Sequence, residues 1–432
     1  MIETYKFRLY PTEEQKIHLA KHFGCVRFIY NWALKFNQQR YAAQQKYMNS
    51  IALNCAGETV KLKQQNDWLY EVNSQSLISA VGHLDRAFNN FFAGRAKFPR
   101  FKSKRFDRDS FEVPQHFSID FKNSKVKMPK FSRNNGIKVE ISNKVKKGKI
   151  GTATVSKDRD GAYYVSFIVH TKCKPKSIID KSKISMANAL GIDFGLKTFI
   201  ICSNGVQIDS PQYFKQMLDK LAIEQKKLSR KKKQSKRRER QKRKVAKVHN
   251  KIADQRKDFL HKVSTKLVKE SQFDCFCIED LSLQGMKKLW GRKVSDLGWY
   301  TFTSMLNYKA LKEGKILKKI GRFEASSQIC HCCGHRQKMP LDVRTYECPE
   351  CGMNMDRDLN AAINIRNFAL RDLKSSGNEA TTGTVECNAH GDESSGMYDA
   401  SCACETVVNE VRKSSDCKLC KEEHSKITSF RM

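Results

Sequence analysis

Three carboxylates stand where metal-dependent phosphodiester chemistry could use them. Asp193 ends the apolar run 189–192, and Glu279 ends a second, near-continuous apolar run, 273–278. Asp358 opens a segment whose apolar residues recur at helical spacing. Cleavage of a phosphodiester by two Mg²⁺ ions about 4 Å apart needs carboxylates to hold the ions. Together the three acids therefore predict a divalent-metal site.

Each acid also has a structural interpretation. An Asp beside a turn commonly caps it, and Gly195 follows Asp193 closely. A carboxylate in the first turn of a helix, as expected for Asp358, complements the helix dipole. Asp280, the neighbour of Glu279, competes with it for a catalytic role. Taken separately the acids are more often structural, whereas the order Asp, Glu, Asp favours the catalytic interpretation.

The segments around the first two acids predict the fold that carries them. A strand ends at Asp193, a second strand follows, and Asn204-Gly205 predicts a hairpin turn. This succession is typical of the opening of an RNase H-like fold. The apolar run before Glu279 predicts a central strand buried on both faces, with the carboxylate at its carboxyl edge.

Four cysteines have the spacing of one tetrahedral zinc site. They form two Cys-x-x-Cys pairs separated by 14 residues: Cys330, Cys333, Cys348 and Cys351. Such a four-thiolate site is structural, because it leaves no coordination position for water. Gly334 and Gly352 directly follow the pairs, where we expect a turn with a positive φ. Cys332 is a spare thiol.

The last residues differ in composition from the rest of the chain. Residues 371–432 hold 8 Lys/Arg and 11 Asp/Glu with little periodicity, which predicts a flexible acidic tail. Two further cysteine pairs lie there, Cys402 with Cys404 and Cys417 with Cys420. They either bind a second metal or are incidental, and their irregular surroundings favour the incidental interpretation.

The charge of the chain indicates a polyanionic partner. A formal net charge of +36 would destabilise a compact monomer by self-repulsion, so nucleic acid is the expected partner. An anionic membrane surface is the alternative, but no apolar run approaches the ~18 residues that span a bilayer. The amino-terminal residues lack the apolar core of a secretory signal, so the sixteen cysteines indicate thiols and metal ligands in the reducing cytoplasm.

Residues 226–257 carry the densest positive charge. They hold 17 Lys/Arg against only Glu239 and Asp254. This pattern predicts both the solvated tip of a helical hairpin and a surface that binds a phosphate backbone. The expected buried face of the second arm consists of Val245, Val248, Ile252, Phe259, Val263 and Leu267.

The first 172 residues predict a helical block within a β domain. Residues 5–10 alternate as a strand, and Thr12 with Gln15 predicts a capping box for a helix that Gly24 ends. Helical spacing continues to about residue 93. Further strands are predicted at residues 111–113, 137–141, 150–155 and 163–169. They favour a small antiparallel barrel or sandwich that the first strand joins, with the helices as an insertion.

A basic and aromatic segment follows the helical block. In residues 98–105, Phe98 and Phe101 alternate with cations, a composition suited to phosphate contact and base stacking. A basic loop pinned by the two phenylalanines is an equally good interpretation.

With these residues considered together, the sequence resembles the TnpB (OrfB) family of transposon-encoded RNA-guided nucleases, relatives of the type V CRISPR effectors. The resemblance runs through most of the chain and rests on eight segments. These are Tyr5–Pro11, Gly24–Trp32, Phe98–Phe101, Gly191–Gly195, Gln255–His261, Ile278–Leu281, Ser326–Cys330 and Asp356–Ala362.

The resemblance implies a multidomain α+β and α/β architecture. It implies a wedge-like antiparallel β-barrel (1–11 and 108–180), an inserted helical recognition lobe (12–107), a RuvC-like nuclease domain (181–325 and 356–370), a zinc-ribbon target-binding module (326–355) and a tail (371–432). The tail has no clear counterpart in the family.

The resemblance also implies an activity: cleavage of DNA beside a short target-adjacent motif, directed by a guide RNA from the transposon end, with one protein per RNA. The family's catalytic acids fall on Asp193, Glu279 and Asp358, which would hold two Mg²⁺ ions, and its structural Zn²⁺ falls on the four cysteines. We expect a cytoplasmic, nucleoid-associated protein. Two alternatives remain, a nuclease-inactive RNA-guided regulator, in which such acids are lost, and a strand-transfer transposase on the same fold.

Overall fold

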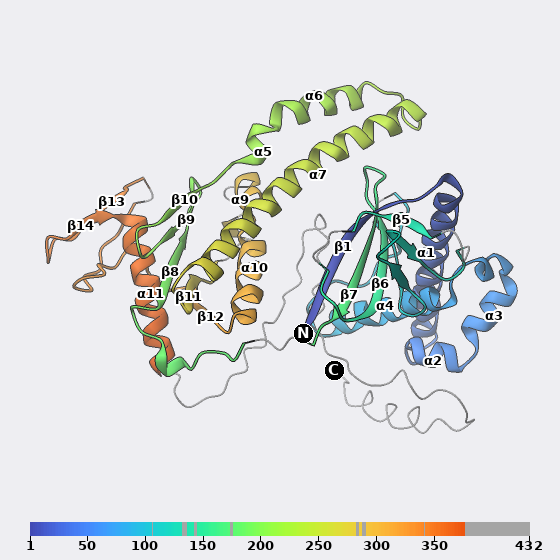
Figure 1. The fold of residues 1–432 in the computed structure, drawn as a ribbon, viewed down its shortest axis with the longest axis horizontal. Helices are drawn as coiled ribbons and strands as arrows, with labels where there is room; N and C mark the ends of the chain where they lie inside the picture. The colour runs from blue at the N-terminus through green and yellow to red at the C-terminus, as the bar shows by residue number, and fades with distance from the viewer. Residues whose placement is uncertain are drawn as a thin grey trace. The chain divides into compact units, whose positions relative to one another are not determined.

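The computed structural model describes residues 1–105, 107–131, 136–141, 145–172, 176–281, 285–286, 291–340 and 342–375 (Figure 1). They form two compact units. The N-terminal unit contains residues 2–158 and 162–171, and the C-terminal unit contains residues 159–161 and the described residues after 171. Within the described residues, no helix combines the length and the apolar character that a bilayer crossing requires.

The N-terminal unit is built on a seven-stranded antiparallel sheet with the order β2-β6-β7-β1-β5-β4-β3. The strands are β1 (Ile2–Tyr10), β2 (Asp109–Val113), β3 (Ser118–Asp120), β4 (Lys125–Lys127), β5 (Ile137–Val139), β6 (Lys149–Lys157) and β7 (Tyr163–His170). Strand β1 pairs with β7 from Ile2 opposite His170 to Leu9 opposite Tyr163, which confirms that the first strand joins the later ones.

The predicted antiparallel barrel or sandwich is confirmed in part. The seven strands form one antiparallel sheet, but over the described residues this sheet is not closed, because its edge strands β2 and β3 each pair with a single neighbour.

Helix α1 (Glu13–Ala42) begins as expected and ends later than expected. The Thr12 hydroxyl accepts a hydrogen bond from the Gln15 amide at 3.3 Å, and the Gln15 side chain accepts one from the Thr12 amide at 3.0 Å. The predicted end at Gly24 is wrong, because the helix continues to Ala42. Phe23 and Cys25 on either side of the glycine are buried in the core, and this burial outweighs the ~1 kcal/mol that Gly costs within a helix.

The predicted helical block over residues 12–93 is confirmed, with interruptions. After α1 it contains α2 (Ser50–Cys55), α3 (Glu58–Gln65), a 3₁₀ turn (Asp67–Glu71) and α4 (Ser74–Phe92). Apolar side chains of α1 and α4 share one core with the inner residues of the sheet.

The C-terminal unit has a mixed five-stranded sheet with the order β10-β9-β8-β11-β12. Its strands are β8 (Ala189–Phe194), β9 (Thr198–Cys202), β10 (Gln207–Asp209), β11 (Cys275–Glu279) and β12 (Ile316–Ile320). The first three run antiparallel, whereas β11 pairs parallel with both β8 and β12. Gly205 in the β9–β10 turn has a φ of 83°, as the predicted hairpin requires.

Helices cover both faces of this sheet (Figure 1). Helix α11 (Arg357–Ser375) packs on the face that Cys275 and Cys277 of β11 present. Helices α7 (Lys236–Thr265) and α10 (Trp299–Lys312) pack on the opposite face, with Phe276 and Ile278 of β11. The apolar run before Glu279 is therefore a strand buried on both faces, as its composition predicts.

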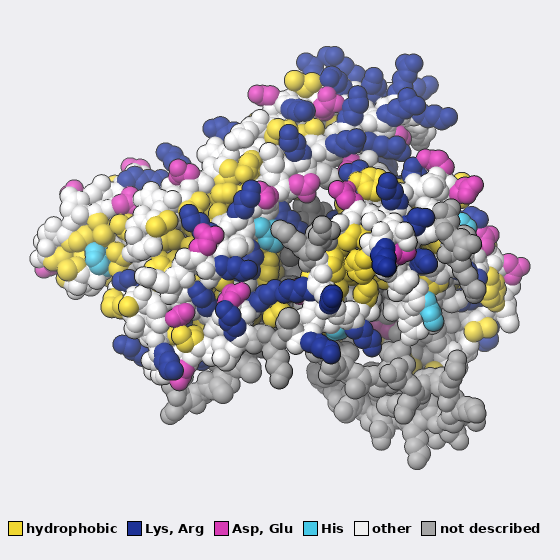
Figure 2. Space-filling model, in the orientation of Figure 1, with side chains coloured by type: hydrophobic (Ala, Val, Ile, Leu, Met, Phe, Trp, Pro, Cys, Tyr) yellow, Lys and Arg dark blue, Asp and Glu magenta, His cyan; other side chains and the backbone are white. Residues whose placement is uncertain are grey.

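The basic segment forms a helical hairpin. Helix α6 (Leu218–Ser229) packs against α7 through Leu221, Val248 and Ile252. Figure 2 shows Lys and Arg side chains gathered at the end of this hairpin. The helix α11 continues to Ser375, so the first five residues of the predicted tail are helical, and the tail cysteines lie outside the described residues.

Candidate active site and cysteine cluster

Asp193 and Glu279 lie at the same edge of the sheet. In the parallel pairing of β8 with β11, Ile192 is opposite Ile278, so the next residues are the two acids. Side chains alternate along a strand, so both carboxylates point to the same face as Cys275 and Cys277, the face that α11 covers. Each acid is half-buried.

A glycine allows α11 to bring the third acid to this edge. A Cβ atom built on Gly191 would lie 1.9 Å from the Ala362 carbonyl oxygen, so α11 packs directly on the β8 backbone. Asp358 is four residues before Ala362 on the same helix face, ~6 Å along the axis. Asp193 is two residues beyond Gly191, ~6.6 Å along the strand. The steps are similar in length, and the charge of Asp358 acts on Asp193, so the two acids lie near each other.

The helix cap of α11 does not depend on Asp358. The Asp356 carboxylate accepts hydrogen bonds from the backbone amides of Asp358 at 3.0 Å and Leu359 at 2.9 Å. These bonds satisfy two of the amides that a helix leaves unpaired at its start. Asp356 therefore caps the start of α11, and this observation weakens the interpretation that Asp358 is present only to stabilise the helix.

Burial and charge change the acidity of the acids at this edge. Burial, together with the negative charges of Glu279 and Asp358, raises the pKa of Asp193 to about 8. Burial also raises the pKa of Glu279, which a hydrogen bond from the Ser326 hydroxyl partly offsets. Like charges that converge in a desolvated place favour protonation unless a cation is bound.

Two arginines engage the third acid. Arg344 Nη1 lies 3.2 Å from one carboxylate oxygen of Asp358, and Arg357 Nη2 lies 3.1 Å from the other. Arg357 is buried and also donates to the Pro340 carbonyl at 3.0 Å. Neither arginine was predicted, although one stands between the two acids Asp356 and Asp358 in the sequence.

The competing acid Asp280 has other partners. Its carboxylate lies 2.9 Å from Arg322 Nη2 and 3.8 Å from Lys319 Nζ. Alternation along the strand directs it to the face opposite that of Glu279. The geometry thus places Glu279, and not Asp280, with Asp193.

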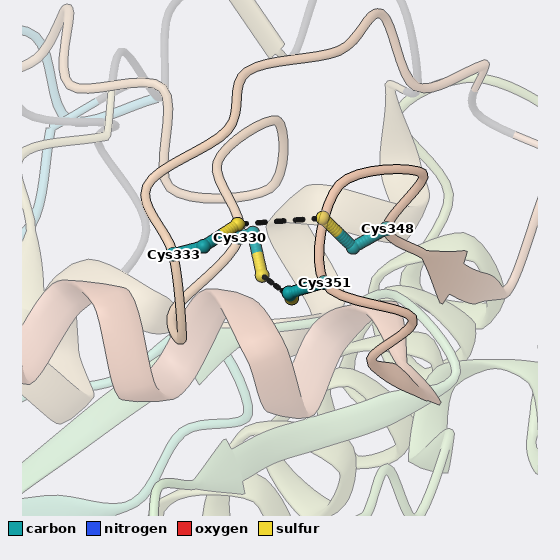
Figure 3. Close-up of side chains that lie close together, drawn as sticks. All are labelled: Cys330, Cys333, Cys348 and Cys351. Atoms are coloured by element: carbon teal, nitrogen blue, oxygen red, sulfur yellow. Dashed lines mark hydrogen bonds between the residues drawn. The ribbon is translucent and has the colours of Figure 1, made fainter.

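The four predicted cysteines converge (Figure 3). Their sulfur atoms all lie within 4.8 Å of one another. Cys330 Sγ is 3.7 Å from Cys351 Sγ, and Cys333 Sγ is 3.5 Å from Cys348 Sγ. Zn–S bonds of about 2.3 Å in a tetrahedron place sulfur atoms about 3.8 Å apart. The cluster therefore fits one zinc ion.

The turns around this cluster follow the prediction. Gly334 and Gly352 have φ angles of 79° and 68°, and their amides bond to the carbonyls of Cys330 and Cys348, each at 3.0 Å. The second pair lies between β13 (Thr345–Glu347) and β14 (Asn354–Asp356), which are antiparallel. The spare Cys332 is exposed.

The predicted aromatic and basic segment is a loop that Phe98 and Asn31 hold in place, and its contact with nucleic acid stays a prediction. Phe98 packs edge-on against Phe88 and Phe91, at ring centroid distances of 5.6 and 5.3 Å. Asn31 holds the backbone of Lys102 through two hydrogen bonds, of 2.7 and 2.9 Å. Phe98 and Phe101 are each 49% exposed. The ring of Phe98 packs against two other phenylalanines and still presents part of its surface to solvent, as Phe101 does.

Three family models match the chain. One described as "Probable transposase" matches residues 173–289, and one described as "Cas12f1-like, TNB domain" matches residues 299–365. A third, described as "Helix-turn-helix domain", matches residues 1–46. In that range the structure has strand β1 and the single helix α1 instead of two helices joined by a turn.

Relatives match over most of their length. The chain is 37% identical over 365 residues to "Putative RNA-guided DNA endonuclease" of Streptomyces pristinaespiralis, with 84% of this chain and 88% of that protein covered. It is 31% identical over 383 residues to "Putative RNA-guided DNA endonuclease InsQ" of Escherichia coli (strain K12), with 84% and 91% covered. The solved structure "Cryo-EM structure of the Cas12f1-sgRNA-target DNA complex" matches with a TM-score of 0.46 and 14% identity, over 85% of this chain and 99% of that one. On the identities and coverages of the Streptomyces and Escherichia relatives, the chain belongs to the OrfB (TnpB) family.

Proposed function

We propose that this chain is an RNA-guided, Mg²⁺-dependent DNA endonuclease of a transposable element, which cleaves DNA next to a short target-adjacent motif. One observation carries the proposal. Asp193, Glu279 and Asp358, far apart in the sequence, converge at one edge of the sheet, where their charges and burial raise the pKa of Asp193 to about 8.

The three carboxylates fit divalent cations. Converging like charges in a half-buried site are relieved by bound cations, and Mg²⁺ prefers carboxylate oxygens. Asp193, Glu279 and Asp358 would hold two Mg²⁺ ions. When bound, the ions supply an activated water and stabilise the leaving oxyanion. Asp358 would exchange contacts with Arg344 and Arg357 for a metal contact.

The strand order supports an RNase H-like, RuvC-type domain over residues 181–325 and 356–370. Three antiparallel strands followed by two parallel ones agree with the opening that the sequence predicts around Asp193. Asp193 is the last residue but one of β8, and Glu279 is the last residue of β11, the strand beside it.

The cysteine cluster supports a zinc-ribbon module over residues 326–355. Its four sulfurs leave no open coordination position, so the metal would be structural. The matching model described as "Cas12f1-like, TNB domain" supports a target-binding role for this module.

The partners follow from charge and from the relatives. A net charge of +36 suits two polyanions, and two relatives are named as RNA-guided DNA endonucleases. We assign a guide RNA and a target DNA, with one protein per RNA. The N-terminal unit would provide the wedge-like domain (1–11 and 108–180) and the recognition lobe (12–107).

Cleavage of a matched plasmid by protein purified with its co-expressed RNA tests the proposal. Asp193→Asn should abolish cleavage, and sequencing the co-purified RNA should give a non-coding RNA with a variable end. Binding without cleavage by the wild type would instead indicate an RNA-guided regulator. Joined transposon ends without any RNA requirement would indicate a strand-transfer transposase.

A further inference from the structure

We propose that Ser326, Asn360 and Asn364 are positioning residues, which form a hydrogen-bonded connection from the cysteine cluster to the carboxylate of Glu279. This inference rests on the proposed role of Glu279 as a metal ligand. It assigns to the cysteine cluster a second task, orientation of an active-site acid.

The connection begins at the first cysteine pair. His331 lies between Cys330 and Cys333, and its backbone amide donates to Asn360 Oδ1 at 3.0 Å. Asn360 Nδ2 donates to the carbonyl of Ile329 at 2.8 Å. Asn360 is fully buried, with 0% exposure. The side chain of Asn360 on α11 thus binds the backbone on both sides of Cys330, at Ile329 and at His331.

Asn364, one helical turn farther along α11, makes the next link. Its Nδ2 donates to the Ile329 carbonyl at 2.6 Å and to the Ser326 carbonyl at 2.8 Å. It is 2% exposed. A buried amide without partners would destabilise the fold, and Asn is a poor helix former, so helix propensity does not account for Asn at this position. Both of its donor hydrogens serve the segment before the cysteine cluster.

Ser326 completes the connection. Its backbone is held by Asn364, and its hydroxyl donates to Glu279 Oε1. Ser326 is itself buried, with 6% exposure. A half-buried carboxylate at the end of a strand could otherwise adopt several rotamers, and the hydroxyl selects one of them.

The alternative role is plain docking of the module on α11. Docking needs the two asparagines and the Ser326 backbone, but not the Ser326 hydroxyl, which bonds within the described residues only to Glu279. Removal of this hydroxyl therefore separates orientation of Glu279 from attachment of the module.

The first test compares Ser326→Ala with Ser326→Thr, which keeps a hydroxyl, in zinc-loaded, full-length protein. Isothermal titration with Mn²⁺ measures divalent-metal affinity directly, and zinc content reports the state of the cluster. Ser326→Ala should weaken Mn²⁺ binding by about 10- to 100-fold with zinc content unchanged, and Ser326→Thr should restore most of it. Ser375→Ala is the matched control, because this exposed hydroxyl bonds only locally, to the Arg371 carbonyl at 2.9 Å. Wild-type affinity in Ser326→Ala would overturn the inference.

The second test removes the middle link. Asn364→Asp has the same shape but replaces both donor hydrogens with an oxygen that repels the two carbonyls. It should weaken Mn²⁺ binding by about tenfold or more. Asn204→Asp, in the β9–β10 turn, is the control, because it keeps the acceptor for the Val206 amide at 3.2 Å.

A Glu279→Gln variant separates the two possible failures. If Glu279→Gln binds Mn²⁺ and cleaves DNA like the wild type, the proposed function is wrong. If Glu279→Gln loses Mn²⁺ binding while Ser326→Ala and Asn364→Asp keep it, the metal site stands and the connection is wrong.

Discussion

Asp193 and Glu279 each stand one residue beyond a directly paired couple, Ile192 and Ile278, on adjacent parallel strands. Their proximity is therefore fixed by the hydrogen-bonded register of two central strands. Buried strands belong to the most stable part of a domain, so the relative position of the two acids does not depend on the conformation of a loop. Asp358 reaches the pair from a helix that packs on the same strand at Gly191.

Asp193→Asn should reduce cleavage of a matched target by about a thousandfold or more. The bound metal ions stabilise the charge of the transition state by several kcal/mol, and this stabilisation is lost when a ligand no longer holds them. Binding of RNA and target should change little. Plasmid cleavage measures the rate, and a gel-shift assay measures the binding of RNA and target. Asp209→Asn, an exposed acid on β10 of the same sheet, should cleave at the wild-type rate. Equal rates for both variants would show that Asp193 is not catalytic.

In the metal-free protein, Asp193 should contribute less to stability as pH rises. The pKa of folded Asp193 is about 8, against 3.8 as the ordinary value, so between these values the folded chain keeps a proton that the unfolded chain has lost. The free energy of unfolding then falls with increasing pH.

Asn at position 193 cannot titrate, so Asp193→Asn removes this dependence. Urea unfolding without added Mg²⁺ measures the free energy of unfolding of both proteins. The value for the variant minus the value for the wild type should increase by more than about 1 kcal/mol from about pH 5 to about pH 8. Added Mg²⁺ should reverse this increase, since it binds the folded wild type. A pH-independent difference would mean that the Asp193 carboxyl is not perturbed by burial and its neighbours.

Much of the C-terminal unit could be predicted because its signals are local. Cys-x-x-Cys spacing, a strand that ends near Asp193 and a helix that begins near Asp358 each depend on a few neighbouring residues. The structure contains all three, although the strand continues one residue farther, to Phe194. The convergence of the acids could be predicted only through the fold, since nothing local relates residue 193 to residue 358.

Other features needed tertiary information. Gly24 is a reasonable helix end by propensity, but the core on both sides of it keeps the helix intact. The strands β3 and β4 have three residues each, which is too short for a recognisable alternation. Asn360 and Asn364 look like weak helix formers until their backbone partners around Ile329 are known.

Cys333→Ser should abolish zinc binding and lower the unfolding temperature of the C-terminal unit. A structural four-thiolate site contributes its binding free energy to folding, and three thiolates hold the ion far less tightly. Zinc content and thermal unfolding are the measurements. Cys332→Ser, an exposed thiol in the adjacent position, should keep about one zinc ion per chain. Equal zinc content in both variants would contradict the assignment of the cluster.

Phe101→Ala should weaken RNA binding by about 1–3 kcal/mol with little loss of stability, because a half-exposed ring in a fixed basic loop can stack on an unpaired base. Filter binding and thermal unfolding measure the two effects. Phe121→Ala, similarly exposed at 48%, is the control and should bind RNA like the wild type. Phe98→Ala should instead lower stability, because its ring packs against Phe88 and Phe91. A Phe101 variant with wild-type affinity would leave the ring without a role in binding.

The tip of the α6–α7 hairpin should contribute to nucleic-acid binding through charge alone. Lys231, Lys232 and Lys233 lie between the two helices, where Figure 2 shows dense positive charge and all three side chains are exposed. Each phosphate that they neutralise releases condensed counterions, so the affinity falls more steeply with salt as contacts increase. Replacing all three with Gln should reduce the slope of log K against log salt by up to about 3, whereas replacing them with Arg should leave it unchanged. Equilibrium binding over a salt series measures the slope. An unchanged slope in the Gln variant would show that the hairpin tip lies away from the phosphates, and that its charge serves only solvation.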